Sequence, residues 1–181
     1  QKNILLNIIR SSGFYFVEVE TNVTENKNNS VDIIYNFNLG ERAIIKTINF
    51  QGNKIFKDTK LRNVIKSEEG KFWKFITSDK YLDERKIQID ENLLKNFYMN
   101  KGYFKVNIKS SYAKNINNEF FELNFNIDAG EKYFFKNFNY NIENLFDSAN
   151  FTSIIKKTNK LKKKKFSKKK LEDIIDEINK I

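Results

Sequence analysis

The hydrophobic pattern of the chain changes period around Gly102, within the stretch KNFYMNKGYFKVNI (95–108). Before this glycine, Leu94, Phe97 and Tyr98 recur at the spacing of one helix face. After it, apolar residues alternate with polar ones, as in a half-buried strand: Phe104, Val106 and Ile108. Glycine readily adopts the left-handed conformation that ends many helices. The pattern therefore predicts a helix that ends at Gly102 and a strand over 103–112.

The same change of period occurs twice, which indicates a repeat. Gly13 in SSGFYFVEV matches Gly102, 89 residues later, and Gly40 in NLGERAIIKTINF matches Gly130 in DAGEKYFFKNFNY, 90 residues later. The chain of 181 residues has only six glycines, and these pairs use four of them. A period of this length exceeds that of solenoid repeats, so it indicates tandem small domains.

One complete unit is predicted over residues 43–131. Its elements are a strand (43–50), a helix (58–66) with Asp58 as N-cap, a second helix beginning near Asp79 or Tyr81, and two strands (103–112 and 120–128). The two last strands are apolar on one face only, so we expect both helices to cover that face. The predicted fold class is α+β, with tandem β-α-α-β-β units, each a three-stranded mixed sheet with two helices on one face. Strand 120–128 should be central and parallel to strand 43–50.

The flanking residues are predicted to be parts of two further units. Residues 1–42 contain the end of a helix and two strands (14–21 and 31–39), which is the C-terminal part of a unit. Residues 132–181 contain a first strand (132–140) and two helices (147–157 and 168–181), which is the N-terminal part of another. We therefore expect the chain to be a fragment of a longer protein.

The amino-acid composition excludes several kinds of catalytic and metal-binding site. The chain has no cysteine and no histidine, which excludes disulfides, thiolate metal sites, and imidazole bases or zinc ligands. No close pair of carboxylates lies in an obvious pocket loop, so a carboxylate-dependent hydrolase is disfavoured, and we expect no catalytic residues, metal or cofactor. No stretch approaches the roughly 18–20 apolar residues of a membrane-spanning helix.

The formal net charge of +10 leaves two interpretations open. The run LKKKKFSKKK (161–170) carries seven of the positive charges, and it is predicted to be a solvated loop and helix start rather than a site for an anionic partner. A basic nucleic-acid-binding module would place aromatic residues among lysines on one face. Here the aromatic residues lie mostly at alternating core positions, so no nucleic acid is expected as a partner.

Several stretches resemble the POTRA domain, the periplasmic repeat of the BamA family of outer-membrane β-barrel assembly proteins. The most specific is GKFWKFITSDKYLDERKIQIDENLLKNFYMNKGYFKVNI (70–108), which is similar to the third BamA repeat. INFQGNKIF (48–56) is similar to the family's opening strand and Gly-Asn turn, and FNIDAGEKY (125–133) to its closing strand. FNYNIENLF (138–146) lacks the Gly-Asn turn and departs from the pattern. In this register the chain runs from late in a second repeat to the middle of a fourth.

The resemblance implies a location and partners. It implies the periplasmic part of a bacterial outer membrane protein, ahead of a C-terminal membrane barrel in the same full-length chain. It also implies binding of unfolded outer-membrane β-barrel proteins and of lipoprotein subunits of the assembly complex, without catalysis. The POTRA region of a two-partner secretion transporter is the alternative within related proteins, although that class usually carries two repeats.

The strand after Gly102 is the first candidate binding site, because it is predicted to be a sheet edge. An edge can pair with an extended chain through its main chain, whatever the side chains of that partner. The candidate residues are Tyr103, Lys105, Asn107, Lys109 and Ser111. Proline at Lys105 or Asn107 would test the site, provided that the lost N–H points away from the neighbouring strand. The alternative is that the lysines merely protect the edge from pairing.

An aromatic loop is the second candidate site. Phe72, Trp73 and Phe75 lie in the predicted loop between the two helices of the complete unit. They would either anchor a lipoprotein or client protein from an exposed position, or fill the gap between the helices and the next domain.

Overall fold

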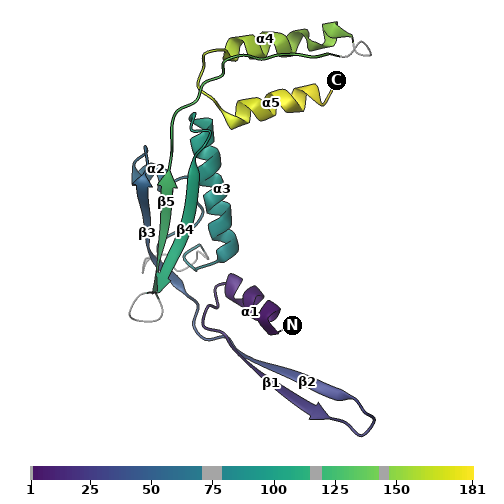
Figure 1. The fold of residues 1–181 in the computed structure, drawn as a ribbon. Coiled ribbons are helices and arrows are strands. Elements are labelled where there is room, and N and C mark those ends of the chain that lie inside the picture. Colours follow the sequence, from purple (N-terminus) through teal and green to yellow (C-terminus); the bar gives the residue numbers. More distant parts are fainter. Residues whose placement is uncertain (1, 71–78, 115–119, 143–146) are drawn as a thin grey trace.

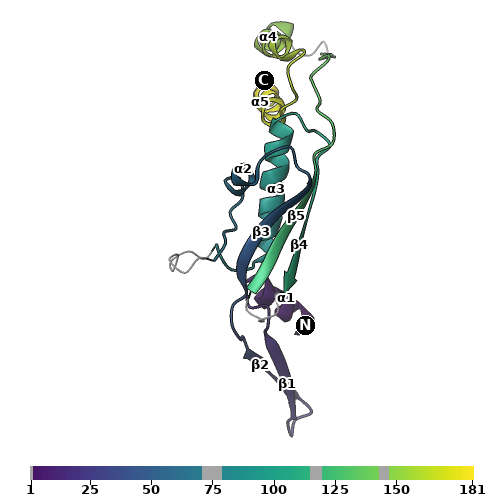
Figure 2. The same cartoon turned by 90° about the vertical axis from the view of Figure 1, so that its left-hand side faces the viewer.

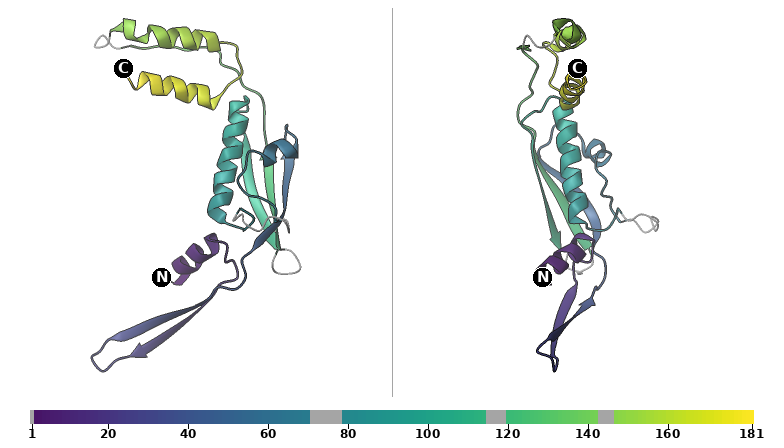
Figure 3. Two further views of the ribbon diagram at one scale, coloured as in Figure 1. Left: turned by 180° about the vertical axis from the view of Figure 1, so that it is seen from behind. Right: turned by 90° about the vertical axis from the view of Figure 1, so that its right-hand side faces the viewer.

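The computed structural model describes residues 2–70, 79–114, 120–142 and 147–181. The chain forms three units in a row (Figure 1). A helix and a two-stranded hairpin lie at the N-terminal end, a three-stranded sheet with its helices lies in the middle, and two helices lie at the C-terminal end. The N-terminal hairpin extends away from the central sheet in every view (Figure 3).

The central unit has the predicted fold. Its elements are β3 (Ile44–Asn53), α2 (Asp58–Arg62), α3 (Glu84–Asn100), β4 (Asn107–Lys114) and β5 (Phe120–Asp128). The strand order is β3-β5-β4, with β5 parallel to β3 and antiparallel to β4. Both helices lie on the same face of this sheet (Figure 2). The predicted α+β class, the central position of 120–128 and its parallel pairing with the first strand are confirmed.

The core lies between the sheet and α3. Phe125 of β5 and Leu94 of α3 are both fully buried, as the alternating and helical patterns predict. The other large buried side chains of this core include Ile45, Ile48, Phe50, Leu61, Leu82, Ile87, Tyr98, Phe121, Leu123 and Ile127. Because β5 is central and its inward residues are apolar at every second position, this strand supports both edges of the sheet.

The helix boundaries differ from the prediction at the start of α3 and at the end of α2. Helix α3 begins at Glu84 rather than near Asp79 or Tyr81, because the Asp83 carboxylate accepts hydrogen bonds from the first-turn N–H groups and caps the helix there. Helix α2 covers only Asp58–Arg62, and Lys57, not Asp58, is its N-cap residue. At the other end of α3 the prediction is confirmed, since Gly102 has a φ of +106°.

The strand after Gly102 also begins later than predicted. Regular pairing with β5 starts at Asn107, and residues 103–106 form a turn. Phe104, predicted to face the core, is 47% exposed. Its ring instead contacts Phe166 at 4.9 Å and Tyr133 at 5.9 Å between ring centres, so it belongs to the junction with the C-terminal unit.

The N-terminal unit comprises α1 (Lys2–Ser11), β1 (Glu18–Glu25) and β2 (Val31–Asn38). β1 and β2 pair as an antiparallel hairpin. Tyr15 and Phe16, which follow α1, pack against Phe121 of the central unit, with ring centres 5.2 and 6.0 Å apart.

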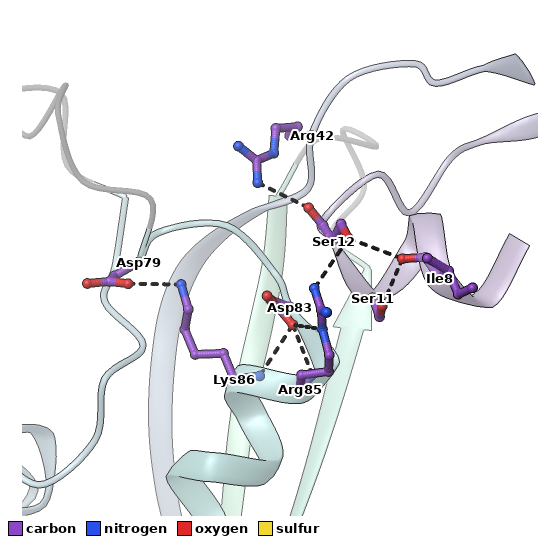
Figure 4. A network of polar contacts seen from close by, with 8 residues as sticks. All are labelled: Ile8, Ser11, Ser12, Arg42, Asp79, Asp83, Arg85 and Lys86. Atoms are coloured by element: carbon purple, nitrogen blue, oxygen red, sulfur yellow. Dashed lines mark hydrogen bonds and ion pairs between the residues drawn. The ribbon is translucent and has the colours of Figure 1, made fainter. Parts of the chain in front are cut away.

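Polar contacts fix the junction between the N-terminal and central units (Figure 4). The Arg42 guanidinium donates to the Ser12 carbonyl at 3.0 Å and lies 4.0 Å from the centre of the Tyr81 ring. Arg85, at the start of α3, donates to the Ser12 hydroxyl at 3.3 Å. The C-terminus of one helix therefore meets the N-terminus of the next.

The junction with the C-terminal unit repeats this arrangement. The N–H of Tyr133 donates to the Gly102 carbonyl at 2.8 Å, just as the N–H of Ala43 donates to the Gly13 carbonyl at 3.0 Å. The side chain of Asn100, at the end of α3, accepts from the N–H of Lys169 in the first turn of the last helix. The repeat seen in the sequence is thus also a repeat of main-chain contacts.

The C-terminal unit comprises a short 3-10 helix (Ser148–Phe151), α4 (Thr152–Leu161) and α5 (Lys168–Ile178). The predicted strand 132–140 is wrong, because only Phe134 forms a β-bridge there, with Lys165. Residues 133–135 do exchange main-chain hydrogen bonds with residues 163–166, but a strand needs such a partner along its whole length, and this pairing stops after a few residues. In the basic run 161–170, Lys162 to Lys165 are exposed between α4 and α5, as predicted.

Candidate functional site

The predicted edge residues fall into two groups. Asn107, Lys109 and Ser111 lie in β4 with exposed side chains, and β4 is an edge strand because β5 is the one strand that pairs with it among the described residues. Tyr103 and Lys105 precede the strand. Tyr103 is buried against Tyr98 and Phe56, and only Lys105 is exposed. The structure therefore brings three of the five together on one strand.

The main-chain groups that face outward from β4 belong to the other residues. The N–H of Ser110 donates to a carboxylate oxygen of Glu91, so it points away from β5. In an antiparallel pair, neighbouring residues point their N–H and C=O groups to opposite sides. Asn107, Lys109 and Ser111 therefore pair with β5 through their main chain, and the outward groups are those of Ile108, Ser110 and Tyr112. A proline at Asn107 would break the sheet instead of the binding edge.

Helix α3 lies beside this edge and supplies two carboxylates. Glu91 accepts from the Ser110 N–H at 2.5 Å, and Glu84, two turns earlier, accepts from the Tyr112 hydroxyl at 2.5 Å. Burial of Tyr112, together with the carboxylate of Glu84, raises the pKa of the phenol above its usual range. The two contacts differ in kind: Glu84 accepts a hydrogen bond from a side chain of β4, whereas Glu91 accepts one from its main chain. Among the described residues, the outward N–H groups of Ile108 and Tyr112 have no partner.

The opposite edge, β3, is covered by the segment that connects α2 to α3. Ile45 donates to the carbonyl of Lys80 and accepts from the N–H of Gly70, both at 2.8 Å. Further along, the N–H of Ile48 donates to Glu69 at 2.9 Å, and its carbonyl accepts from Arg62 at 2.5 Å. The outward groups of Ile45 and Ile48 on this edge are thus occupied by the chain itself.

Asp90 supports this covering segment from α3. It is fully buried, and its carboxylate accepts from the N–H groups of Lys66 at 2.6 Å and Ser67 at 3.0 Å. Sequence analysis missed Asp90, Glu84 and Glu91. The signal for Asp90 was present, since an acidic residue lies between Ile87 and Leu94 on the apolar face of a helix. Nothing in the sequence singles out Glu91, because its partner is a main-chain group.

The aromatic loop candidate cannot be placed. Phe72, Trp73 and Phe75 lie outside the described residues. Within the described ranges, no group of three or more acidic, cysteine or histidine side chains is arranged to hold a metal ion. In the same part of the chain, no helix is both long and apolar enough to cross a membrane.

The central unit matches a known family. Residues 43–130 match the POTRA family model, which is described as a surface antigen variable number repeat. The chain is 33% identical over 92 residues to the outer membrane protein assembly factor BamA of Neisseria meningitidis serogroup B, and 29% identical over 107 residues to that of Neorickettsia risticii. These alignments cover 51% and 59% of this chain but 12% and 14% of the relatives, so the chain spans a small part of their length.

A solved structure resembles the whole arrangement. The crystal structure of POTRA domains 3–5 of BamA from Haemophilus influenzae aligns with 99% of this chain and 69% of its own, with a TM-score of 0.61. The sequences are 14% identical, so this likeness concerns the fold.

Proposed function

We propose that this module binds unfolded outer-membrane β-barrel proteins, and that an extended segment of such a client pairs with the β4 edge. The proposal builds on the match of residues 43–130 to the POTRA family and on the similarity of the chain to the periplasmic part of BamA. Main-chain pairing suits such clients, since it does not depend on their side chains. The proposal contains no catalytic step.

The difference in occupancy between the two sheet edges carries this proposal. On β3, the outward groups of Ile45 and Ile48 already have partners within the chain. On β4, the outward groups are held only at Ser110 among the described residues, by Glu91. An extended partner would therefore find more free main-chain donors and acceptors on β4 than on β3.

Accessory lipoproteins are the second proposed class of partner. We propose that the exposed side chains of Lys105, Asn107, Lys109 and Ser111 line the approach to the edge, where they would contact a partner bound to β4. Phe72, Trp73 and Phe75 stay a proposal from sequence for a separate lipoprotein contact. In the full-length protein, we propose that the module precedes a C-terminal membrane barrel.

Adjacent proline substitutions test the edge. Ser110→Pro removes an outward N–H and leaves the β5 ladder intact, so the domain should fold but lose binding. Lys109→Pro removes an N–H that pairs with β5 and leaves its acceptor without a donor, so it should destabilise the domain by about 1–3 kcal/mol. The probe is a fluorescent peptide with the sequence of the last strand of an outer-membrane β-barrel protein, and its affinity is measured by anisotropy.

A backbone-methylated version of the peptide is the matched control, because it keeps the side chains but cannot pair. It should bind at least tenfold more weakly than the parent peptide. The proposal is wrong if folded Ser110→Pro binds the parent peptide as tightly as the unsubstituted domain does. In that case, replacing Trp73 by alanine tests the aromatic loop with the same peptide.

A further inference from the structure

The Ser110 N–H points outward from β4 and donates to the Glu91 carboxylate. Among the described residues, it is the one outward N–H of β4 that has a partner. We infer that Glu91 competes with a partner strand for the Ser110 N–H, and that its displaced carboxylate selects strands with a lysine or arginine opposite Ser110. This inference rests on the proposed pairing at β4. Main-chain pairing alone does not distinguish the side chains of a partner strand. The role inferred for Glu91 adds a preference for strands that carry a basic side chain opposite Ser110.

The position of Glu91 is set by a helix that is well anchored. Helix α3 is capped by Asp83 at its start, and the neighbouring Asp90 is buried and bonded to two N–H groups of the covering segment. One residue along the helix turns the side chain by about 100°. Asp90 therefore points to the core while Glu91 points to β4. The contact with Ser110 does not require any loop to be ordered.

Binding of a strand must break this contact. A strand that pairs with β4 places a carbonyl on the Ser110 N–H, which is where the Glu91 oxygen now lies, 2.5 Å away. The carboxylate then loses its donor, and in the described chain it has no ion pair to replace it. A half-buried carboxylate without a donor is unfavourable, so the partner that supplies a new one is preferred.

The geometry of a sheet says where that donor must lie. Ser110 is opposite Phe125, which is buried under the helices, so the Ser110 side chain is on the helix-covered face. Residues directly opposite each other on adjacent strands point to the same face. The side chain of the partner residue opposite Ser110 therefore extends on the same face as Glu91. A lysine or arginine there can donate to the displaced carboxylate.

Hydrogen exchange tests the competition without any ligand. In Glu91→Ala, the amide of Ser110 should exchange about tenfold faster than in the unsubstituted domain, because its acceptor is gone. Glu84→Ala is the matched control: the same helix and the same kind of residue, but a bond to the Tyr112 side chain. It should leave the Ser110 amide unchanged. Equal Ser110 exchange in Glu91→Ala and the unsubstituted domain overturns the inference, whatever the peptide results.

Peptide binding tests the selection. The probes are extended peptides of alternating valine and threonine in which one lysine, or one glutamate, is moved through each position. The unsubstituted domain should prefer lysine over glutamate by about five- to tenfold at one position only. In Glu91→Ala that preference should disappear, and the peptide without a charge should bind more tightly than to the unsubstituted domain. Glu84→Ala should keep the preference.

The outcomes separate the two proposals. If no peptide binds either protein, the pairing at β4 itself is wrong. If peptides bind through the main chain, as judged by backbone methylation, but the lysine preference is absent or survives in Glu91→Ala, then the pairing stands and the role of Glu91 is wrong.

Discussion

The two edges of the central sheet have the same main-chain groups but are covered differently. At β3, the segment between α2 and α3 returns along the strand and bonds to Ile45 directly, and Arg62 and Glu69 bond to Ile48. At β4, α3 lies alongside and reaches the edge only through the side chains of Glu84 and Glu91. The main-chain contacts at Ile45 keep the β3 edge closed, whereas the single side-chain contact of Glu91 on β4 can open by a change of rotamer.

Under the proposed pairing at β4, this difference lets one small domain protect its edges and still offer one of them to a partner. Unpaired edges invite pairing with other chains, and native proteins usually cover or protect them. Here the connection between the helices protects β3. The exposed Lys109 and the carboxylate of Glu91 protect β4 in a way that a partner can displace. The two sequence-based interpretations of the β4 edge, binding and protection, are therefore compatible.

The largest expected effect comes from the strand that supports both edges. Phe125→Ala should lower the free energy of unfolding by about 3–5 kcal/mol, since the fully buried ring stacks on Phe50 and its loss leaves a cavity. Urea denaturation measures this change. Hydrogen exchange should rise at Ile48 and Ser110 together. Phe134→Ala, at a position 58% exposed, is the control and should change stability by less than about 0.5 kcal/mol.

A rise in exchange at only one of those two amides in Phe125→Ala would mean that the edges are supported separately. The β3 and β4 edges would then not unfold as parts of one cooperative sheet.

A smaller effect is expected from opening the β3 edge. Arg62 bonds to Glu69 and to the Ile48 carbonyl, and both side chains are partly exposed. Arg62→Ala with Glu69→Ala should therefore cost only about 1–2 kcal/mol. The double variant should bind strand peptides at a second site, measured as stoichiometry by calorimetry. Lys157→Ala with Glu177→Ala, an ion pair between α4 and α5 that does not reach β3, is the control.

A stoichiometry that stays at one peptide per domain in the stable double variant would show that the remaining contacts of the covering segment are enough to close β3.

Much of the fold follows from local patterns. Alternation in 120–128 predicted a one-sided central strand, and the glycine after Tyr98 predicted the end of α3 because a left-handed residue is required there. The start of β4 was predicted too early because Phe104 continues the alternation, although it packs on Phe166 of the next unit. The strand over 132–140 was wrong because a strand depends on a neighbour as much as on its own residues.

The candidate site was less predictable than the fold. Alternation shows which side chains face the core, and it correctly put Lys109 and Ser111 on the solvent face. It does not show which N–H groups face the neighbouring strand, since that depends on the register of two strands. Glu91 and Ser110 are 19 residues apart in the sequence, yet the Glu91 carboxylate contacts the Ser110 N–H. This contact depends on how α3 is rotated about its axis when it packs on the sheet.

The smallest expected effect concerns the side-chain attachment of β4. Tyr112→Phe removes the hydrogen bond to Glu84 and should cost about 0.5–1.5 kcal/mol near pH 7. Burial and Glu84 raise the pKa of Tyr112, and burial raises the pKa of Tyr98 to about 12, both above the value of about 10 for an unfolded tyrosine. The stability linked to these shifts is therefore present below about pH 10 and is lost as the pH rises through the folded values.

Tyr112→Phe should accordingly lose less stability between pH 9 and 11 than the unsubstituted domain, because only the contribution of Tyr98 remains. Urea denaturation at pH 7, 9 and 11 measures this difference, and the comparison with the unsubstituted domain cancels the titration of the lysines. Tyr35→Phe is the control, since Tyr35 lies in β2 of the N-terminal hairpin, which pairs with β1 and not with β4. Strand binding at β4 should survive Tyr112→Phe, because the outward main-chain groups remain. If binding is lost along with the hydroxyl, then Glu84 positions the edge, and the distinction between side-chain and main-chain attachment on β4 is wrong.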